Sequence, residues 1–557
     1  MAIERSRIRW NGWGWAAHRD ALSSREEVWS WLARQLGMPS LLATPCQRLE
    51  DVALPPSRLA AHDRAQFVAL LGAERAREDR DARACHARGK SYHDLLYLRA
   101  GLLSAAPDIV LYPRAADETL SILRIAHQSG IAVVPYGGGT SVVGGVSASA
   151  PAFNATATLD LSGMDRVLDI DPQSGTARAE AGIAGPALEM ALAEKGVTLG
   201  HTPQSFEFST LGGWIAHRGA GQQSNRYGKA EDWLIAATLA TPRGMLVTDS
   251  SPASASGPRL VDLIAGSEGI FGVITDATFR VRAMPEQVED RAWLFRDFES
   301  GITAIRRTVQ NEIPVSMLRL SDADETAFYR ALSDIGAGRS PYRFLSRKYL
   351  DLRGMDDRAA ALIASFEGSA DGVASTRSRF AAIASQLGGI ALGRGPGRSW
   401  REGRFRAPYL RDPMLDRGLG VDTFETAATW AKLTGLHAAV REALGKVVAG
   451  TAPYPSARGI VMCHLSHSYR DGASLYFTCI FPRALGDEFA QWRAIKSAAT
   501  NAIMENGGTL SHHHGVGEDH LPWMVREKGE LGLDVLRAIK RALDPAGILN
   551  PGKLIPS

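Results

Sequence analysis

Three consecutive histidines, His512, His513 and His514, stand between GGTLS and GVG near the end of the chain. Histidine exchanges protons near neutral pH and so suits general acid–base catalysis. The run is internal and bounded by glycines, unlike a tag, and no carboxylate or thiol is adjacent to complete a transition-metal site. We predict a catalytic or substrate-binding role and no metal; a structural tract and a metal-chelating tract are the alternatives.

A glycine-rich stretch, PYGGGTSVVGGV, covers Pro135–Val146. Consecutive glycines allow positive φ angles and let the backbone approach a ligand closely. Their N–H groups can form an anion-binding nest that suits a pyrophosphate, and Thr140 and Ser141 add hydroxyl donors. The pattern is neither a Walker A loop nor GxGxxG, so neither of those mechanisms applies. A plain tight turn is the alternative.

Two further loops carry similar chemistry. They are GHTPQSFEFSTLGG (Gly200–Gly213), which precedes Trp214, and GSEGIFG (Gly266–Gly272). Three such loops separated by predicted strands are hard to explain as coincidental turns. They suit a long dinucleotide threaded between the strands.

The elements around these loops follow an alternating strand and helix pattern that is typical of α/β structure. Before the first loop we predict a strand at 108–112, a helix at 115–129 and a strand at 132–135. Other expected elements are a hairpin of 167–170 and 176–179, helices at 26–36, 184–195 and 529–543, and strands at 474–480 and after residue 273.

The chain of 557 residues is too long for one ordinary core. We predict a helical N-terminal extension (1–95), a cofactor-binding domain (96–285), a second domain (286–505) and a C-terminal segment that returns to the site (506–557). Trp10, Trp13 and Trp15 in the extension fit an anchor on a core better than a substrate cage.

Bulk composition excludes several classes of protein. The net charge of +3 is too small to indicate nucleic-acid binding, and the four cysteines contain no CxxC pair. We find no signal peptide and no apolar run long enough to span a membrane. We therefore expect a cytoplasmic protein without disulfides; peripheral membrane contact is left open.

The motifs together resemble the alkyl-dihydroxyacetonephosphate synthase branch of the vanillyl-alcohol-oxidase superfamily. WNGWGW (10–15), PDIVLYP (107–113), GGGTSV, EAGIAG (180–185), GSEGIFGVIT, YLRD (409–412), TFETAATW (423–430) and SHHHGVG (511–517) occur in the expected order over nearly the whole chain. The resemblance implies an α+β fold with a two-part PCMH-type FAD-binding domain and a cap domain of mixed sheet and helices. It implies FAD as cofactor, which we predict to be noncovalent because no histidine is obviously placed for a covalent bond.

By this resemblance, the FAD-binding residues lie in the three loops. They are Pro135, Gly137, Gly138, Gly139, Thr140, Ser141, Pro203, Ser205, Ser209, Thr210, Gly213, Trp214, Gly266, Glu268, Gly269, Gly272, Val273 and Ile274.

The resemblance also assigns the reaction site. Tyr476 matches the family's catalytic tyrosine and His512–His514 its histidine triplet, while Arg411 matches an arginine that binds substrate phosphate. Arg319 matches a second active-site arginine. Metal-dependent hydroxy-acid dehydrogenases of the superfamily carry HxGDGNxH and GEHGIG; here Tyr469, Tyr476 and His513 replace the three ligands, which disfavours metal-assisted oxidation.

The implied activity exchanges the acyl group of a phosphate lipid for a long-chain alcohol through a flavin N5 adduct, in ether lipid synthesis. Two departures favour an alternative, an FAD-linked oxidase or dehydrogenase of an alcohol or 2-hydroxy acid. The family's GHEPDS reads GHTPQS at 200–205, and residues 395–408 are rich in arginine. A non-enzymatic flavin scaffold is a third reading, and a homodimer is expected only from base rates.

Overall fold

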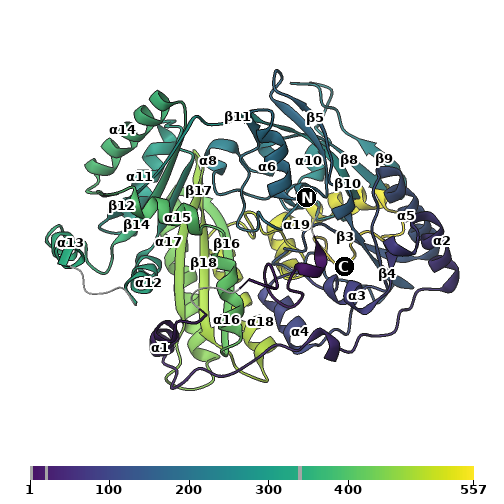
Figure 1. The fold of residues 1–557 in the computed structure, drawn as a ribbon, viewed down its shortest axis with the longest axis horizontal. Coiled ribbons are helices and arrows are strands. Elements are labelled where there is room, and N and C mark those ends of the chain that lie inside the picture. The colour runs from purple at the N-terminus through teal and green to yellow at the C-terminus, as the bar shows by residue number, and fades with distance from the viewer. Residues whose placement is uncertain (1–3, 19–22, 336–340, 557) are drawn as a thin grey trace.

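A small parallel sheet carries the first glycine loop. In the computed structural model, which describes residues 4–18, 23–335 and 341–556, its strands lie in the order β1-β2-β4-β3 (Figure 1). Strand β2 (Ile109–Leu111) leads through helix α5 (Ala116–Ser129) to β3 (Ile131–Tyr136), as predicted. Strand β4 (Ala155–Asp160) lies between them and pairs in parallel with both, while β1 (Ala76–Arg77) is antiparallel to β2.

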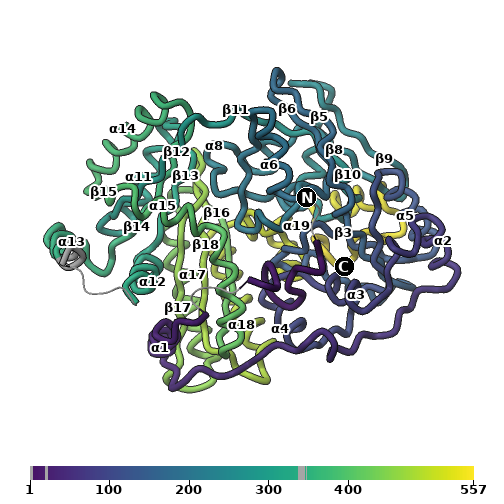
Figure 2. The backbone as a smooth tube through the Cα atoms, viewed as in Figure 1, coloured from purple at the N-terminus to yellow at the C-terminus, as the bar shows by residue number. Residues whose placement is uncertain are grey.

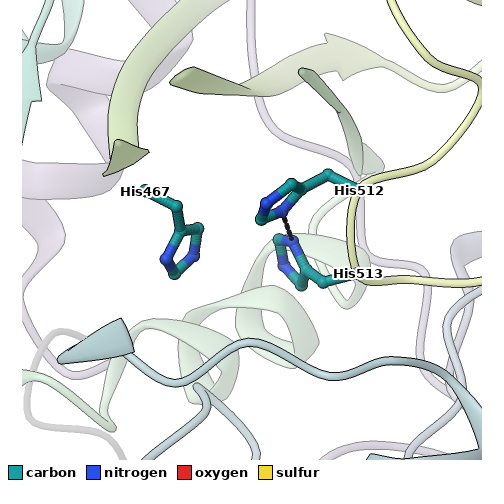
Figure 3. A group of neighbouring side chains, drawn as sticks. All are labelled: His467, His512 and His513. Carbon is teal, nitrogen blue, oxygen red and sulfur yellow. Dashed lines mark hydrogen bonds between the residues drawn. The ribbon is translucent and has the colours of Figure 1, made fainter. Parts of the chain in front are cut away.

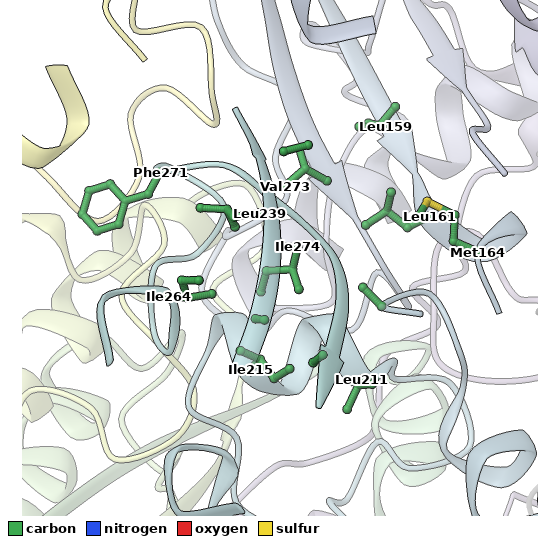
Figure 4. Close-up of a cluster of buried hydrophobic side chains, with 14 of the residues drawn as sticks. Leu159, Leu161, Met164, Leu211, Ile215, Leu239, Ile264, Phe271, Val273 and Ile274 are labelled. Carbon is green, nitrogen blue, oxygen red and sulfur yellow. The ribbon is translucent and has the colours of Figure 1, made fainter. Parts of the chain in front are cut away.

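A five-stranded antiparallel sheet follows, in the order β5-β6-β10-β8-β9. The predicted hairpin forms β5 (Val167–Asp171) and β6 (Thr176–Glu180), and β10 (Val273–Arg280) follows the third glycine loop. Buried apolar side chains join this sheet to the parallel one in a shared core (Figure 4). The remaining elements of this region are α6 (Gly185–Ala193), β7 (Val197–Thr198), α7 (Leu211–Ala216), α8 (Ser224–Tyr227), α9 (Ala230–Trp233), β8 (Leu234–Thr241), β9 (Gly244–Val247), α10 (Val261–Ile264) and β11 (Arg282–Ala283).

The third sheet, called the cap sheet below, has seven antiparallel strands in the order β15-β12-β14-β13-β17-β18-β16. It lies at the left of Figure 1, and its helices share a second core with it. Its strands are β12 (Gln287–Phe295), β13 (Met317–Ser321), β14 (Ala360–Gly368), β15 (Ile390–Gly393), β16 (Leu419–Thr429), β17 (Ile460–Ser468) and β18 (Gly472–Pro482). Its helices are α11 (Phe298–Gln310), α12 (Ala323–Asp334), α13 (Pro341–Leu352), α14 (Ala370–Gln386), α15 (Gly395–Gly403), α16 (Arg411–Leu415) and α17 (Trp430–Gly450).

The N-terminal extension runs along both halves of the molecule (Figure 2). Helix α1 (Glu26–Gln35) packs beside the seven-stranded sheet, whereas α2 (Ala61–Leu71) joins the core of the first two sheets. Helices α3 (Arg80–Cys85) and α4 (Tyr92–Ala100) complete it. The ring of Trp13 lies 5.8 Å from that of Phe208, and that of Trp15 5.0 Å, so these tryptophans pack as anchors.

The C-terminal segment returns from the cap to the parallel sheet. After α18 (Glu488–Glu505) comes the histidine run, and then α19 (Met524–Leu543). Gly529, whose φ of 69° breaks the helical path, divides α19 into a short first part and a longer second part, and the second part begins where the helix of 529–543 was predicted. Beyond α19, Leu549 forms a parallel bridge with Val133 of β3. The predicted α+β class is confirmed.

Candidate active site

The first glycine loop presents free backbone donors on one side. The N–H groups from Gly138 to Ser141 donate to no residue in the described part of the chain. On the opposite side, the Arg5 guanidinium binds the carbonyls of Gly137 and Gly138 and pairs with Asp160 at 2.9 Å. The loop is therefore fixed through its carbonyls while its N–H groups stay available for an anion, which fits a pyrophosphate.

The other two glycine loops converge on the same place. A Cβ added at Gly138 would overlap the Phe208 carbonyl oxygen, and one added at Gly269 would lie 2.9 Å from the Pro135 ring. Within the described residues, the buried His217 Nε2 and Ser267 Oγ have no hydrogen-bond partner. Close-packed glycines and orphaned polar atoms are what a bound dinucleotide requires.

Some predicted cofactor residues have side chains that the protein itself uses. Val273 and Ile274 point into the core, and Thr210 caps helix α7. The Trp214 indole donates to Ser209 Oγ at 2.7 Å. The other members of the predicted set lie in the three loops, and their contact with FAD stays a prediction.

Replacing Gly138 with alanine is expected to weaken FAD binding about tenfold or more, since the new Cβ would push two loops apart. Flavin absorbance per mole of purified protein measures this. Gly435→Ala is the matched control, because a Cβ there meets nothing within 4 Å. Wild-type flavin content in Gly138→Ala would contradict the assigned loop.

Tyr476 lies at the centre of the cap side of the site. On β18 it stands opposite Glu425 of β16 and His464 of β17. Its ring stacks on His464 with centroids 5.0 Å apart, and on His513 at 6.1 Å. Burial raises the pKa of Tyr476 to about 12, so its hydroxyl stays protonated at neutral pH.

The histidine triplet faces Tyr476 and two residues that the sequence patterns did not identify as partners. His512 Nε2 lies 2.5 Å from the Tyr469 hydroxyl, and His512 Nδ1 lies 2.9 Å from His513 Nδ1. The ring of His467 stacks on that of His512 at 5.1 Å. Burial lowers the pKa of His514 to about 3 and that of His512 well below its ordinary value, so these rings are neutral.

One ring nitrogen from each of His467, His512 and His513 lies within 4.8 Å of the others, and Figure 3 shows the three rings next to one another. Such a set could hold a transition metal. However, both ring nitrogens of His512 already have hydrogen-bond partners. We keep proton exchange as the interpretation, and the absence of a metal stays a prediction.

The two predicted arginines have different surroundings. Arg319 donates to Glu325 at 2.9 Å and contacts His464 Nδ1 at 3.0 Å, so it reaches Tyr476 only through the stacked imidazole. Arg411 lies close enough to Tyr476 to oppose the rise of its pKa, and its buried Nε has no partner in the described part of the chain. Burial lowers the pKa of Arg411. A buried guanidinium is stabilised when it binds an anionic group, so this position suits a phosphate.

Two buried carboxylates hold the histidine loop. Glu425, only 4% exposed, binds the loop at its histidines, and Glu268 accepts from the N–H groups of Val516 and Gly517 at 2.6 and 2.7 Å. Glu268 was predicted to bind FAD, but its carboxylate is occupied by this loop. The sequence analysis assigned no role to Glu425, although this residue lies in the TFETAATW motif, because a single glutamate in a strand has no local sequence pattern that indicates its partners.

The two departures that favoured an oxidase contact each other. The Gln222 and Gln204 amides both donate to the Arg404 carbonyl, at 3.4 and 2.5 Å, and the rings of Phe206 and Phe405 stack at 5.6 Å. Arg401 binds Asp290 and Glu367 of the cap sheet. These segments therefore join the two halves of the protein.

The chain matches two family models and several known proteins. Family models described as FAD binding domain and as FAD linked oxidases, C-terminal domain, match residues 107–250 and 284–554. The chain is 36% identical to alkyldihydroxyacetonephosphate synthase of Trypanosoma brucei brucei, over 88% of this chain and 79% of that protein. The synthase of Dictyostelium discoideum is 33% identical, over 99% and 94%. A solved alkyldihydroxyacetonephosphate synthase structure matches all of both chains with a TM-score of 0.83 at 30% identity.

Proposed function

Because this chain belongs to the alkyldihydroxyacetonephosphate synthase family, we propose that it exchanges the acyl group of acyl-dihydroxyacetone phosphate for a long-chain alcohol. The products are a fatty acid and an ether lipid. FAD is the cofactor, and when bound it supplies the nucleophilic ring nitrogen that covalent catalysis needs. The reaction is redox-neutral overall, so no external electron acceptor is required.

The observation that carries this proposal is the convergence around Tyr476 of several neutral proton carriers and of Arg411, whose buried Nε has no partner among the described residues. Arg411 binds the substrate phosphate through its planar guanidinium. Holding the phosphate there fixes the reacting carbon relative to Tyr476 and the glycine loops. The Tyr476 hydroxyl, protonated at neutral pH, donates a proton, and the neutral histidines accept one from the incoming alcohol.

A small apolar cavity lies next to the helical turn that carries Arg411. It is about 10 Å³ in volume, which is room for about one water molecule and not for an alkyl chain, and its lining includes Leu410 and Met414. The rest of the lining comes from α1 and α12, namely Val28, Trp29, Trp31, Leu32, Phe328 and Leu332.

Product analysis tests the proposal. Purified holoenzyme is incubated without oxygen with acyl-dihydroxyacetone phosphate and a long-chain alcohol, and lipids are measured by mass spectrometry. We expect ether lipid and fatty acid in equal amounts, with no oxidant consumed. Absence of ether lipid, together with dye reduction by a D-2-hydroxy acid or an alcohol, would establish the oxidoreductase alternative.

We further propose that the protein contacts lipid surfaces peripherally through α13. Leu345, Tyr349 and Leu352 recur at helical spacing and are 65%, 50% and 85% exposed. In the described part of the chain, no helix is long and apolar enough to span a bilayer. Leu345→Ser with Leu352→Ser is expected to reduce co-sedimentation with anionic vesicles several-fold, while the Leu531→Ser control is not. Equal binding by all variants would contradict the assignment of lipid contact to α13.

A homodimer and a cytoplasmic location stay predictions.

A further inference from the structure

Glu425 lies at the hub of the histidine loop and is buried there. Its Oε1 accepts from the Ser511 hydroxyl at 2.7 Å and from the N–H groups of His513 and His514 at 3.1 and 2.9 Å. Its Oε2 accepts from the N–H of His512 at 2.8 Å. One carboxylate therefore fixes the backbone of all three histidines, through donors that have no other described acceptor.

The same residue is tied to Tyr476 through the sheet. Glu425 and Tyr476 are directly paired across β16 and β18, and eleven paired positions hold these two strands in register. A shift of β16 would therefore move the histidine loop relative to the tyrosine. Glu268, in the third glycine loop, binds the other end of the histidine loop at Val516 and Gly517. The histidine loop is therefore held at one end by the cap sheet and at the other by the third glycine loop.

The charge of Glu425 also acts on the rings. Burial would raise the pKa of Glu425, yet the histidines and Ser511 stabilise the carboxylate and keep this pKa well below its ordinary value. In turn, the carboxylate opposes the burial that lowers the pKa values of His513 and His514. The other titratable or charged groups facing this cluster are Tyr476, His201, His464, His467, Tyr469, Lys229, Arg411, Lys496 and His520.

We propose that Glu425 is a positioning residue for proton transfer, acting through the histidine triplet and not on substrate. The kinetic effects expected from this proposal rest on the proposed function, the exchange of an acyl group for an alcohol. The positioning itself does not depend on which reaction the site performs. A misplacement of about 1 Å in a catalytic group can cost about 100-fold in rate, which sets the expected effect.

The test compares Glu425→Gln, Glu425→Asp and the control Glu367→Gln in the holoenzyme. Glutamine keeps the shape and can keep the three bonds to Oε1, but its amide nitrogen cannot accept from the His512 N–H. Aspartate keeps the charge and is shorter by one methylene. Glu367 is also a buried glutamate of the cap sheet, paired with Tyr227 and Arg401 and away from the triplet.

The rate of hydrogen–deuterium exchange at the amides of residues 511–517 measures how firmly the loop is held, and it requires no catalytic reaction. We expect exchange about tenfold faster in both Glu425 variants and unchanged in Glu367→Gln. For the reaction, we expect kcat to fall about 100-fold in Glu425→Gln, with KM within about threefold. Loss of the charge should move the acid limb of the kcat–pH profile to lower pH, because the histidine pKa values fall; Glu425→Asp should keep the wild-type limb.

Unchanged exchange in folded Glu425→Gln would overturn the positioning role. Faster exchange with unchanged kcat would overturn its part in the reaction. If wild-type protein fails to make ether lipid, the proposed function fails, while the exchange measurement still decides whether Glu425 holds the loop.

Discussion

Tyr476→Phe is expected to lower kcat by about 10²- to 10⁴-fold, the range for loss of a positioned proton donor. KM should change little, because the ring still stacks on His464 and His513 and only the hydroxyl is removed. The raised pKa of about 12 means that the residue works as a protonated donor, so the remaining activity should not recover at alkaline pH.

Steady-state kinetics with acyl-dihydroxyacetone phosphate and alcohol, each varied separately, measure this effect. Tyr454→Phe is the control, because Tyr454 packs beside α1, away from the histidines. A kcat within about twofold of wild type in Tyr476→Phe would remove the hydroxyl from the mechanism.

Arg411→Met is expected to raise KM for the acyl phosphate about 100-fold, equivalent to about 3 kcal/mol of binding. Lysine should restore only part of the affinity, because it offers a point charge in place of a planar fork. The ligand-free protein should unfold at the same or a higher temperature, since methionine replaces a buried cation whose Nε has no described partner.

Arg319→Met provides the contrast. It leaves the buried Glu325 without its nearest cation, so we expect a loss of about 3 kcal/mol in stability. Thermal unfolding and KM together separate the two arginines. A stability loss in Arg411→Met with unchanged KM would show that Arg411 is structural and would contradict its assignment to phosphate.

The parts of the site that lie in continuous segments could be predicted from sequence. Three glycine loops and a histidine run have local patterns, and a turn or nest is set by a few neighbouring residues. The predicted strand 108–112, helix 115–129 and strand 132–135 are found as β2, α5 and β3, with bounds differing by one residue. That β4 inserts between β2 and β3 could not be predicted, because strand order depends on contacts between distant segments.

The residues that sequence reasoning missed depend on such contacts. Glu425 matters only because β16 and β18 pair in one register, which sets it opposite Tyr476. His464 and His467 are three apart, and a regular strand would point them to opposite faces. A register shift between Leu465 and Ser468 lets both contact the site. The link between Gln204 and Arg404 joins segments 200 residues apart.

The most direct test of the central claim follows the flavin spectrum without oxygen. Purified yellow protein is mixed with acyl-dihydroxyacetone phosphate, and a long-chain alcohol is added afterwards. The account predicts bleaching with release of fatty acid by the first addition, and recovery of colour after the alcohol with no oxidant present. Bleaching only by an alcohol or a D-2-hydroxy acid, with recovery requiring oxygen or a dye, would contradict it and make this chain an oxidoreductase on the same fold.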